Sequence, residues 1–263
     1  MSVFSIAEVA GCHDGDITKA LRLIEQAKRI GADAVKVQWT SDPKRLAERR
    51  HVTDPSIYRY IAFPRWWLDT LKAACCAGVG IEFMCTVYLP EDISAVAAHI
   101  SRFKVASFEA RDHEFIKAHQ PYGWEVIIST GMNPYGLDWN EMFDLDDELE
   151  MRTRYLHCVS GYPTPIDQIN LRVIHDGYYD GLSDHTGHMF TGGLAVAAGA
   201  EIIEFHMRLD DTDVSNPDYS VSLNPHDAET YVEWIRRAEM MMGDGVKKVE
   251  QSEEKNLQYR VGV

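Results

Sequence analysis

Eight short apolar or β-branched runs recur along the chain, and segments with helical spacing separate them. The runs are Val3–Val9, Ala34–Trp39, Gly80–Val87, Arg102–Ser107, Glu125–Thr130, Arg154–Val159, Gly181–His185 and Glu201–Met207. This alternation is typical of parallel strands joined by crossover helices, because parallel neighbours need a long connection. Eight such units are the number that closes a single-domain (β/α)8 (TIM) barrel of the α/β class. A doubly wound open sheet is the alternative, since periodicity alone does not show closure.

Helical segments connect the expected strands. The clearest is Asp16–Ile30, whose apolar residues repeat at helical spacing until Gly31 ends it. Further helices are expected at Pro64–Ala77, Glu91–His99, Leu137–Glu150, Thr191–Ala198 and Asp227–Met242, with shorter ones near Phe115 and Asn170. We therefore expect one barrel domain over residues 1–243 and a polar C-terminal extension over residues 244–263.

Charge excludes two classes of partner. The chain has 26 basic and 41 acidic side chains and a net charge of −15, with no run of Lys and Arg. Such a surface repels nucleic acid and anionic membranes, so we expect neither as a partner.

The cysteines and the N-terminus indicate a compartment. Five cysteines, including the adjacent pair Cys75 and Cys76, make a poor disulfide framework and indicate reduced thiols. The first residues lead directly into a strand-like run without the features of a signal peptide, and no apolar stretch has the length of a membrane helix. The sequence predicts a soluble, cytoplasmic protein.

Polar residues gather where the predicted strands end. In a barrel the loops that follow the strands build the active site, so these residues should form a ring at one end. The ring would contain Glu8, Lys36, Gln38, Thr86, Lys104, Ser107, Glu109, Ser129, Ser160, Tyr162, Ser183, His185, Glu204 and His206.

Two lysines in this ring favour an anionic ligand. Lys36 and Lys104 each lie in an otherwise apolar strand, where a charge is costly to bury unless it meets an opposite charge. The alternative for each lysine alone is a side chain that reaches outward between helices. Hydroxyl donors at neighbouring strand ends, from Thr86, Ser107, Ser129 and Ser183, favour a phosphate site.

Two histidines indicate a metal. His185 and His206 end the seventh and eighth predicted strands, which are neighbours in a barrel. Neutral imidazoles suit a divalent transition metal, and two protein ligands would leave positions for water and substrate oxygen. The alternative is a pair of core histidines with ordinary hydrogen bonds. An acidic residue within two positions of each, Asp184 and Glu204, favours the metal.

Several motifs in a shared order resemble the sialic acid synthase (N-acetylneuraminate synthase) family and its pseudaminic and legionaminic acid relatives, over nearly the whole chain. They are Ile6-Ala7-Glu8 with His13-Asp14-Gly15, the run 31–38, Phe103–Ser107, Ile128–Met132, His157-Cys158 with Tyr162–Pro165, Leu182–Thr186, the run 199–206, and Pro217-Asp218 with Ser222.

The resemblance implies a transferase that condenses phosphoenolpyruvate with an N-acetylmannosamine-like or related aldose in carbohydrate biosynthesis. It places Mn²⁺, or alternatively Mg²⁺ or Co²⁺, on His185 and His206. It also places Lys36, Thr86, Lys104, Ser107, Ser129, Ser160 and Ser183 around phosphoenolpyruvate, and Glu8, Gln38, Glu109, Tyr162 and Asp218 around the sugar. Glu8 is the first candidate for proton transfer and Glu109 the second.

The departures from the family pattern lie mainly on the sugar side. Ala10 replaces a usual Gly, Cys12 a usual Asn, and Tyr219 a usual His. Family members usually continue into a C-terminal antifreeze-like domain that covers the barrel. We therefore expect either that a separate protein supplies this cap or that the sugar is recognised differently. The partner implied by the resemblance is a second copy of the chain, which would make a homodimer, or such a cap protein. The alternatives to a synthase are a metal-dependent aldolase or lyase acting on a related keto acid, and a barrel that has lost its activity.

Overall fold

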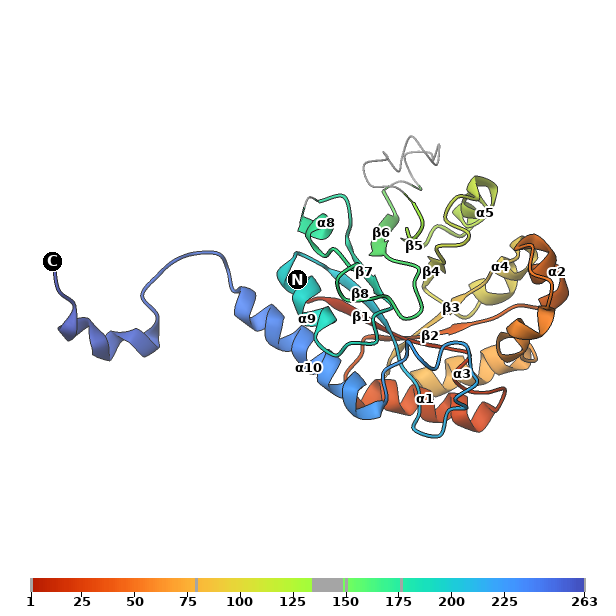
Figure 1. The fold of residues 1–263 in the computed structure, drawn as a ribbon, viewed down its shortest axis with the longest axis horizontal. Coiled ribbons are helices and arrows are strands. Elements are labelled where there is room, and N and C mark those ends of the chain that lie inside the picture. Colours follow the sequence, from red (N-terminus) through yellow and green to blue (C-terminus); the bar gives the residue numbers. More distant parts are fainter. Residues whose placement is uncertain (1, 79, 134–148, 150, 176, 263) are drawn as a thin grey trace.

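Eight parallel strands form a closed barrel in the computed structural model, which describes residues 2–78, 80–133, 149, 151–175 and 177–262 (Figure 1). The strands are β1 Phe4–Ala10, β2 Ala34–Gln38, β3 Glu82–Thr86, β4 Arg102–Val105, β5 Glu125–Ser129, β6 Thr153–Cys158, β7 Gly181–Asp184 and β8 Ile202–His206. Each pairs with its neighbours in sequence, and β1 pairs with β8. The predicted barrel is confirmed, and the open sheet is excluded.

The helices surround the barrel. They are α1 Ile17–Arg29, α2 Pro43–Arg49, α3 Trp66–Cys76, α4 Pro90–Ala97, α5 His113–Lys117, α8 Arg172–His175, α9 Thr191–Ala197 and α10 Pro225–Met242, with 3-10 helices η1 Pro55–Ile61, η2 Gln120–Tyr122 and η3 Gln251–Tyr259. The predicted helix Leu137–Glu150 lies outside the described residues, except for Leu149. Helix α2 was not predicted, because its sequence is mostly charged. It begins where Asp42 caps the backbone N–H groups of Lys44 and Arg45 and Pro43 occupies the first turn.

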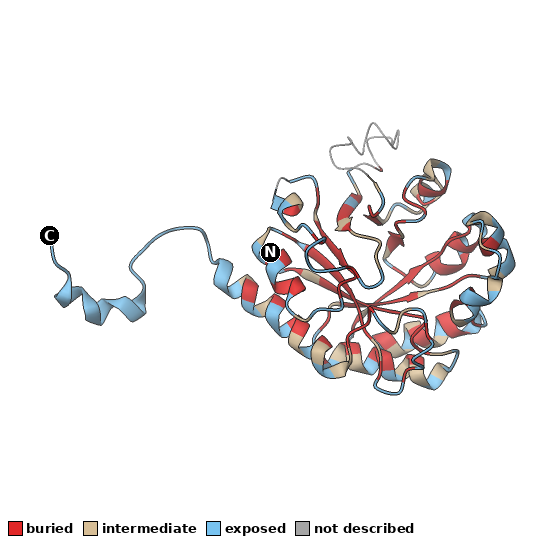
Figure 2. Cartoon of the chain, viewed as in Figure 1, coloured by how far each residue is buried: buried red, intermediate tan, exposed pale blue. Residues whose placement is uncertain are grey.

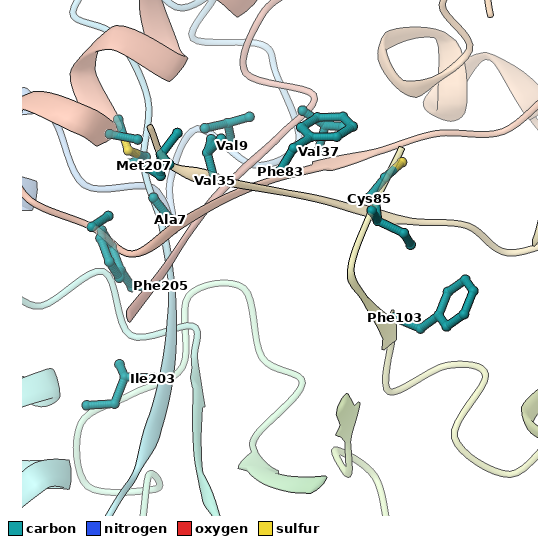
Figure 3. Packing of buried hydrophobic residues seen from close by; sticks show 14 of the residues in the cluster. Ala7, Val9, Val35, Val37, Phe83, Cys85, Phe103, Ile203, Phe205 and Met207 are labelled. Atoms are coloured by element: carbon teal, nitrogen blue, oxygen red, sulfur yellow. The ribbon is translucent and has the colours of Figure 1, made fainter. Parts of the chain in front are cut away.

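Strand alternation divides the interior into two regions. Outward-facing side chains such as Val35, Phe83 and Phe205 pack beneath the helices and form the main core (Figure 3). Inward-facing residues at the N-terminal end of the strands, including Ile6, Met84 and Ile127, form a smaller apolar cluster inside the barrel. The next inward positions toward the C-terminal end are polar. The apolar cluster therefore closes the barrel below a polar layer.

Gly181 of β7 lies where β8 leaves no room for a side chain. A Cβ atom at this position would lie 1.8 Å from the carbonyl oxygen of Ile202. We expect Gly181→Ala to lower the free energy of unfolding by about 1–3 kcal/mol, the range for overpacking a core. Urea denaturation measures this difference. Gly80→Ala is the control, because its Cβ would meet its nearest atom at 3.8 Å. Equal unfolding midpoints for the two variants would contradict the expectation.

The chain leaves the barrel after α10. Residues 243–262 are exposed, including all of η3, and the ribbon runs away from the other elements (Figure 2). Within the described part of the chain, no helix combines the length and apolar character needed to cross a membrane. All five cysteines are free thiols.

Candidate active site

A cavity of about 310 Å³ opens at the C-terminal end of the barrel strands. Most of the predicted site residues line it, namely Glu8, Lys36, Gln38, Thr86, Lys104, Ser107, Ser129, Tyr162, Ser183, His185, His206 and Asp218. Glu109 and Ser160 do not line it. Arg50, Tyr88, Ala106, Phe108, Glu204 and Pro217 also line the cavity, and only Glu204 among them was predicted to belong to the polar ring.

Strand register brings the inner residues together. Glu8 on β1 lies opposite Lys36 on β2 and opposite His206 on β8. Ser183 on β7 lies opposite Glu204 on β8. An irregularity after Glu8 turns the chain at Ala10, whose φ is 44° and whose backbone N–H donates to the Glu8 carboxylate. Glycine adopts this conformation more easily, so the alanine is tolerated here at some strain.

Lys36 is the centre of a buried polar network. Its ammonium group contacts the carboxylate of Glu8, donates to the Thr86 hydroxyl at 2.9 Å, and lies 3.2 Å from Glu204 Oε1. Burial lowers the pKa of Lys36 from 10.5 to about 8, against the opposing effect of Glu204. Most of this ammonium is therefore charged at neutral pH and lies in a low-dielectric setting, where its interaction with an anion is strong.

Lys104 forms the second half of this network. Its ammonium group donates to the Ser129 hydroxyl at 2.6 Å and lies 3.4 Å from Glu204 Oε2, which also accepts a hydrogen bond from Ser183 at 2.9 Å. Burial opposes ionisation of Glu204, but the two lysines outweigh it and hold the pKa of this carboxyl well below its usual range. The two ammonium groups therefore share one carboxylate. The signal for Glu204 in the sequence was its place two positions before His206 on the same strand face.

The hydroxyl groups of Ser107, in the lining, and Ser160, outside it, both lie next to Gly131. A Cβ atom on Gly131 would lie 2.8 Å from Ser107 Oγ and 2.1 Å from Ser160 Oγ, so the glycine leaves room for both hydroxyls. Ser107 Oγ accepts a hydrogen bond of 3.1 Å from the backbone N–H of Gly131. Ser160 Oγ is buried without a hydrogen-bond partner among the described residues. A buried hydroxyl without a partner costs free energy unless a ligand or water completes it.

The two histidines face each other across the seam between β7 and β8. The centroids of their rings are 5.2 Å apart, and the ring of Tyr162 lies 4.3 Å from that of His185. His185 Nδ1 lies 3.0 Å from the Val159 carbonyl, so it carries the proton of the neutral ring and leaves the Nε2 lone pair free. His206 Nδ1 is buried with no hydrogen-bond partner in the described structure.

These histidines fit a divalent metal. Burial lowers the pKa of His206, which keeps the ring neutral and able to coordinate. Burial acts in the same direction on His185, but Cys158 outweighs it and raises the pKa. Among the described residues no third His, Cys, Asp or Glu completes a cluster with them. A metal held here would therefore keep several positions for water and substrate oxygens.

The outer part of the cavity is lined by larger polar and aromatic groups. The Tyr88 hydroxyl group donates a hydrogen bond to the side-chain oxygen of Gln38. Asp218 lies in the loop after β8, where the backbone N–H of Gly11 donates to its carboxylate and burial raises its pKa. Arg50 follows α2 and binds Glu109 through two hydrogen bonds of 2.8 Å. Arg50 and Tyr88 lie beyond the strand ends, and neither was predicted as a site residue.

Comparison with known proteins identifies relatives over nearly the whole chain. The model of the NeuB family matches residues 23–247. Pseudaminic acid synthase from Campylobacter jejuni is 30% identical, over 97% of this chain and 79% of its own. Human N-acetylneuraminate-9-phosphate synthase is 27% identical, over 94% of this chain and 73% of its own.

A solved structure has the same fold over the full length. The N-acetylneuraminic acid synthetase from Leptospira borgpetersenii, crystallised with citrate, superposes with a TM-score of 0.86 at 27% identity. The match covers 99% of this chain and 92% of that one. This chain and the Leptospira protein therefore share the whole barrel fold.

Proposed function

We infer that this chain, which belongs to the NeuB family, condenses phosphoenolpyruvate with a sugar aldehyde to give a 3-deoxy-2-ulosonic acid and phosphate. One observation carries the proposal. Two buried ammonium groups with hydroxyl partners and two inward-facing histidines line the same cavity. The first set suits a phosphorylated acid, and the second suits a metal that acts on an aldehyde.

Lys36 and Lys104 would hold phosphoenolpyruvate. The Thr86 and Ser129 hydroxyl oxygens accept hydrogen bonds from these ammonium groups, so their O–H groups can donate to the ligand. The Ser160 hydroxyl would gain a partner from the phosphate or from a water bound to it. The two ammonium charges are balanced by Glu8 and Glu204 before any ligand binds. A ligand with about three negative charges would therefore enter a site with no net positive charge, which supports a requirement for an additional cation.

His185 and His206 would hold that cation, with Mn²⁺ as the proposed metal. A divalent ion supplies Lewis acidity, which stabilises negative charge that develops on an aldehyde oxygen. Tyr162 packs on His185 and would restrict the orientation of the imidazole. The orientation of the His185 ring is thus set by contacts that need no ligand.

Proton transfer is assigned to Glu8. In the overall reaction C3 of phosphoenolpyruvate bonds to the aldehyde carbon, the aldehyde oxygen gains a proton, water adds at C2, and phosphate leaves with C–O cleavage. Glu8 is buried and lines the cavity, and Lys36 holds its carboxylate. The carboxylate can therefore take the proton that water loses, and pass it on to the new alkoxide. Glu109, the second candidate, is bound to Arg50 outside the lining.

Phosphate release tests the function. Purified protein with phosphoenolpyruvate, Mn²⁺ and a panel of aldoses should release phosphate only when a suitable aldose is present, in equal amount to the ulosonic acid formed. Condensation with pyruvate in place of phosphoenolpyruvate would instead favour the aldolase. If no aldose supports release and phosphoenolpyruvate does not bind, the synthase proposal is wrong.

A further inference from the structure

Arg50 and Glu109 form a closed ion pair at the outer end of the cavity. Nε and Nη2 of Arg50 donate to the two carboxylate oxygens, and the Glu109 side chain is only 2% exposed. The guanidinium group lies 4.5 Å from the centroid of the Tyr88 ring and 4.8 Å from that of Phe108. Bidentate geometry and two aromatic contacts hold the arginine in one place.

The charge of Arg50 is therefore already neutralised. Its remaining terminal nitrogen, Nη1, makes no hydrogen bond with the described residues, and because Arg50 lines the cavity this group is available as a donor to a ligand. Lys36 and Lys104 are the other two cations of the lining, and both lie with Glu8 and Glu204 at the inner end. Within the described residues, the outer end thus offers no unpaired positive charge.

Asp218 gives the outer end the opposite character. Its carboxyl group lines the cavity and accepts a hydrogen bond from backbone Gly11, but it has no ion-pair partner in the described part of the chain. Its charged or protonated form can accept a hydrogen bond from a sugar hydroxyl. A phosphate dianion beside it would lose water and gain no compensating cation.

We propose that the Arg50–Glu109 pair makes the acceptor end select an uncharged polyhydroxy aldose and reject a phosphorylated one. The inference rests on the proposed function and adds the class of acceptor. Arg50 Nη1 donates to a neutral sugar oxygen, and Asp218 and Gln38 accept from hydroxyl groups. Because phosphoenolpyruvate contributes three carbons, a product phosphorylated at carbon 9, such as the one that names the human relative, corresponds to an acceptor phosphorylated at carbon 6. We expect this chain to discriminate against such an acceptor.

Two matched measurements test the proposal. Rates with N-acetylmannosamine and with its 6-phosphate, at saturating phosphoenolpyruvate and Mn²⁺, should give a kcat/KM ratio of about 100 or more in favour of the neutral sugar. Calorimetric binding of the two unreactive alditols, in the presence of phosphoenolpyruvate, should show the same order. Tighter binding of the phosphorylated alditol, or no binding of the neutral one, overturns the proposal. Loss of turnover with both sugars while the neutral alditol binds overturns the synthase function instead.

Glu109→Gln isolates the ion pair. The amide keeps one hydrogen bond to Arg50 but restores the positive charge of the guanidinium, so the preference for the neutral sugar should fall by about tenfold. Asp112→Asn is the matched control, because Asp112 lies three residues later, pairs with Arg49 and does not line the substrate cavity. The control should keep the wild-type ratio. An unchanged ratio in Glu109→Gln, with the alditols still bound, assigns the selectivity to other groups and overturns the role of the pair.

Discussion

Lys36→Met is expected to lower kcat/KM for phosphoenolpyruvate by about 10²–10³-fold, which lies within the roughly 2–5 kcal/mol lost when one partner of a buried charge pair at a binding site is truncated. The Lys36 side chain is 4% exposed, and its ammonium group contacts Glu8, Thr86 and Glu204. Methionine fills a similar volume but leaves two buried carboxylates that repel an incoming anion. Steady-state rates and calorimetric binding of phosphoenolpyruvate measure the loss.

The same substitution will also lower stability, and this effect must be separated from the loss of binding. Lys36→Met/Glu8→Gln removes one charge of each sign, so its free energy of unfolding should recover relative to the single variant while its binding of phosphoenolpyruvate does not. Lys44→Met, on the exposed surface of α2, controls for the loss of one positive charge. If the single variant keeps wild-type affinity for phosphoenolpyruvate, Lys36 is not a phosphate ligand.

The site residues on strands could be predicted from the sequence, because successive side chains of a strand point to opposite faces of the sheet. Burial on the outer face requires apolar residues at alternate positions such as Val35 and Val37, so the polar residue between them, Lys36, must point into the barrel. The same argument places Glu204 and His206 inward on β8. Closure was not predictable in this way, since it depends on the pairing of β1 with β8 rather than on any local pattern.

The site residues on loops, such as Arg50, could not be predicted from the sequence pattern alone. Arg50 follows a short charged helix, and its place in the cavity depends on Glu109, 59 residues later, and on the rings of Tyr88 and Phe108. No local spacing encodes such a long-range contact. Glu109 was expected to face the sugar, yet its carboxylate is bound to Arg50. The inner end of the cavity is built mostly on strands and the outer end mostly on loops, which explains why the first was the more predictable.

Charge balance connects the two halves of the cavity. At the inner end two ammonium groups meet two carboxylates, and at the outer end Arg50 meets Glu109. The protein thus contributes almost no net positive charge to a reaction that uses a highly charged acid. We propose that a cation from solution offsets this charge and that His185 and His206 hold it.

Replacing either histidine with alanine is therefore expected to lower kcat/KM by about 10³-fold or more, since a Lewis acid contributes several kcal/mol to such a reaction. Mn²⁺ should restore chelator-treated wild type but neither variant, and Mn²⁺ binding measured by calorimetry should be lost with activity. The fold should survive, because the His206 ring makes no hydrogen bond through Nδ1 in the described structure. Loss of the His185 ring removes one partner each from the Val159 carbonyl and the Cys158 thiol.

His188→Ala is the matched control for this experiment. His188 lies three residues after His185 in the same loop, is exposed, and does not line the cavity. It should keep wild-type turnover and Mn²⁺ affinity, because only histidines that face the cavity can share one ion. Full activity in both His185→Ala and His206→Ala, together with indifference of the wild type to chelator, would show that the two rings hold no catalytic metal. The charge of phosphoenolpyruvate would then have to be balanced by Lys36 and Lys104 alone, and binding of the anion would require Glu8 or Glu204 to take up a proton.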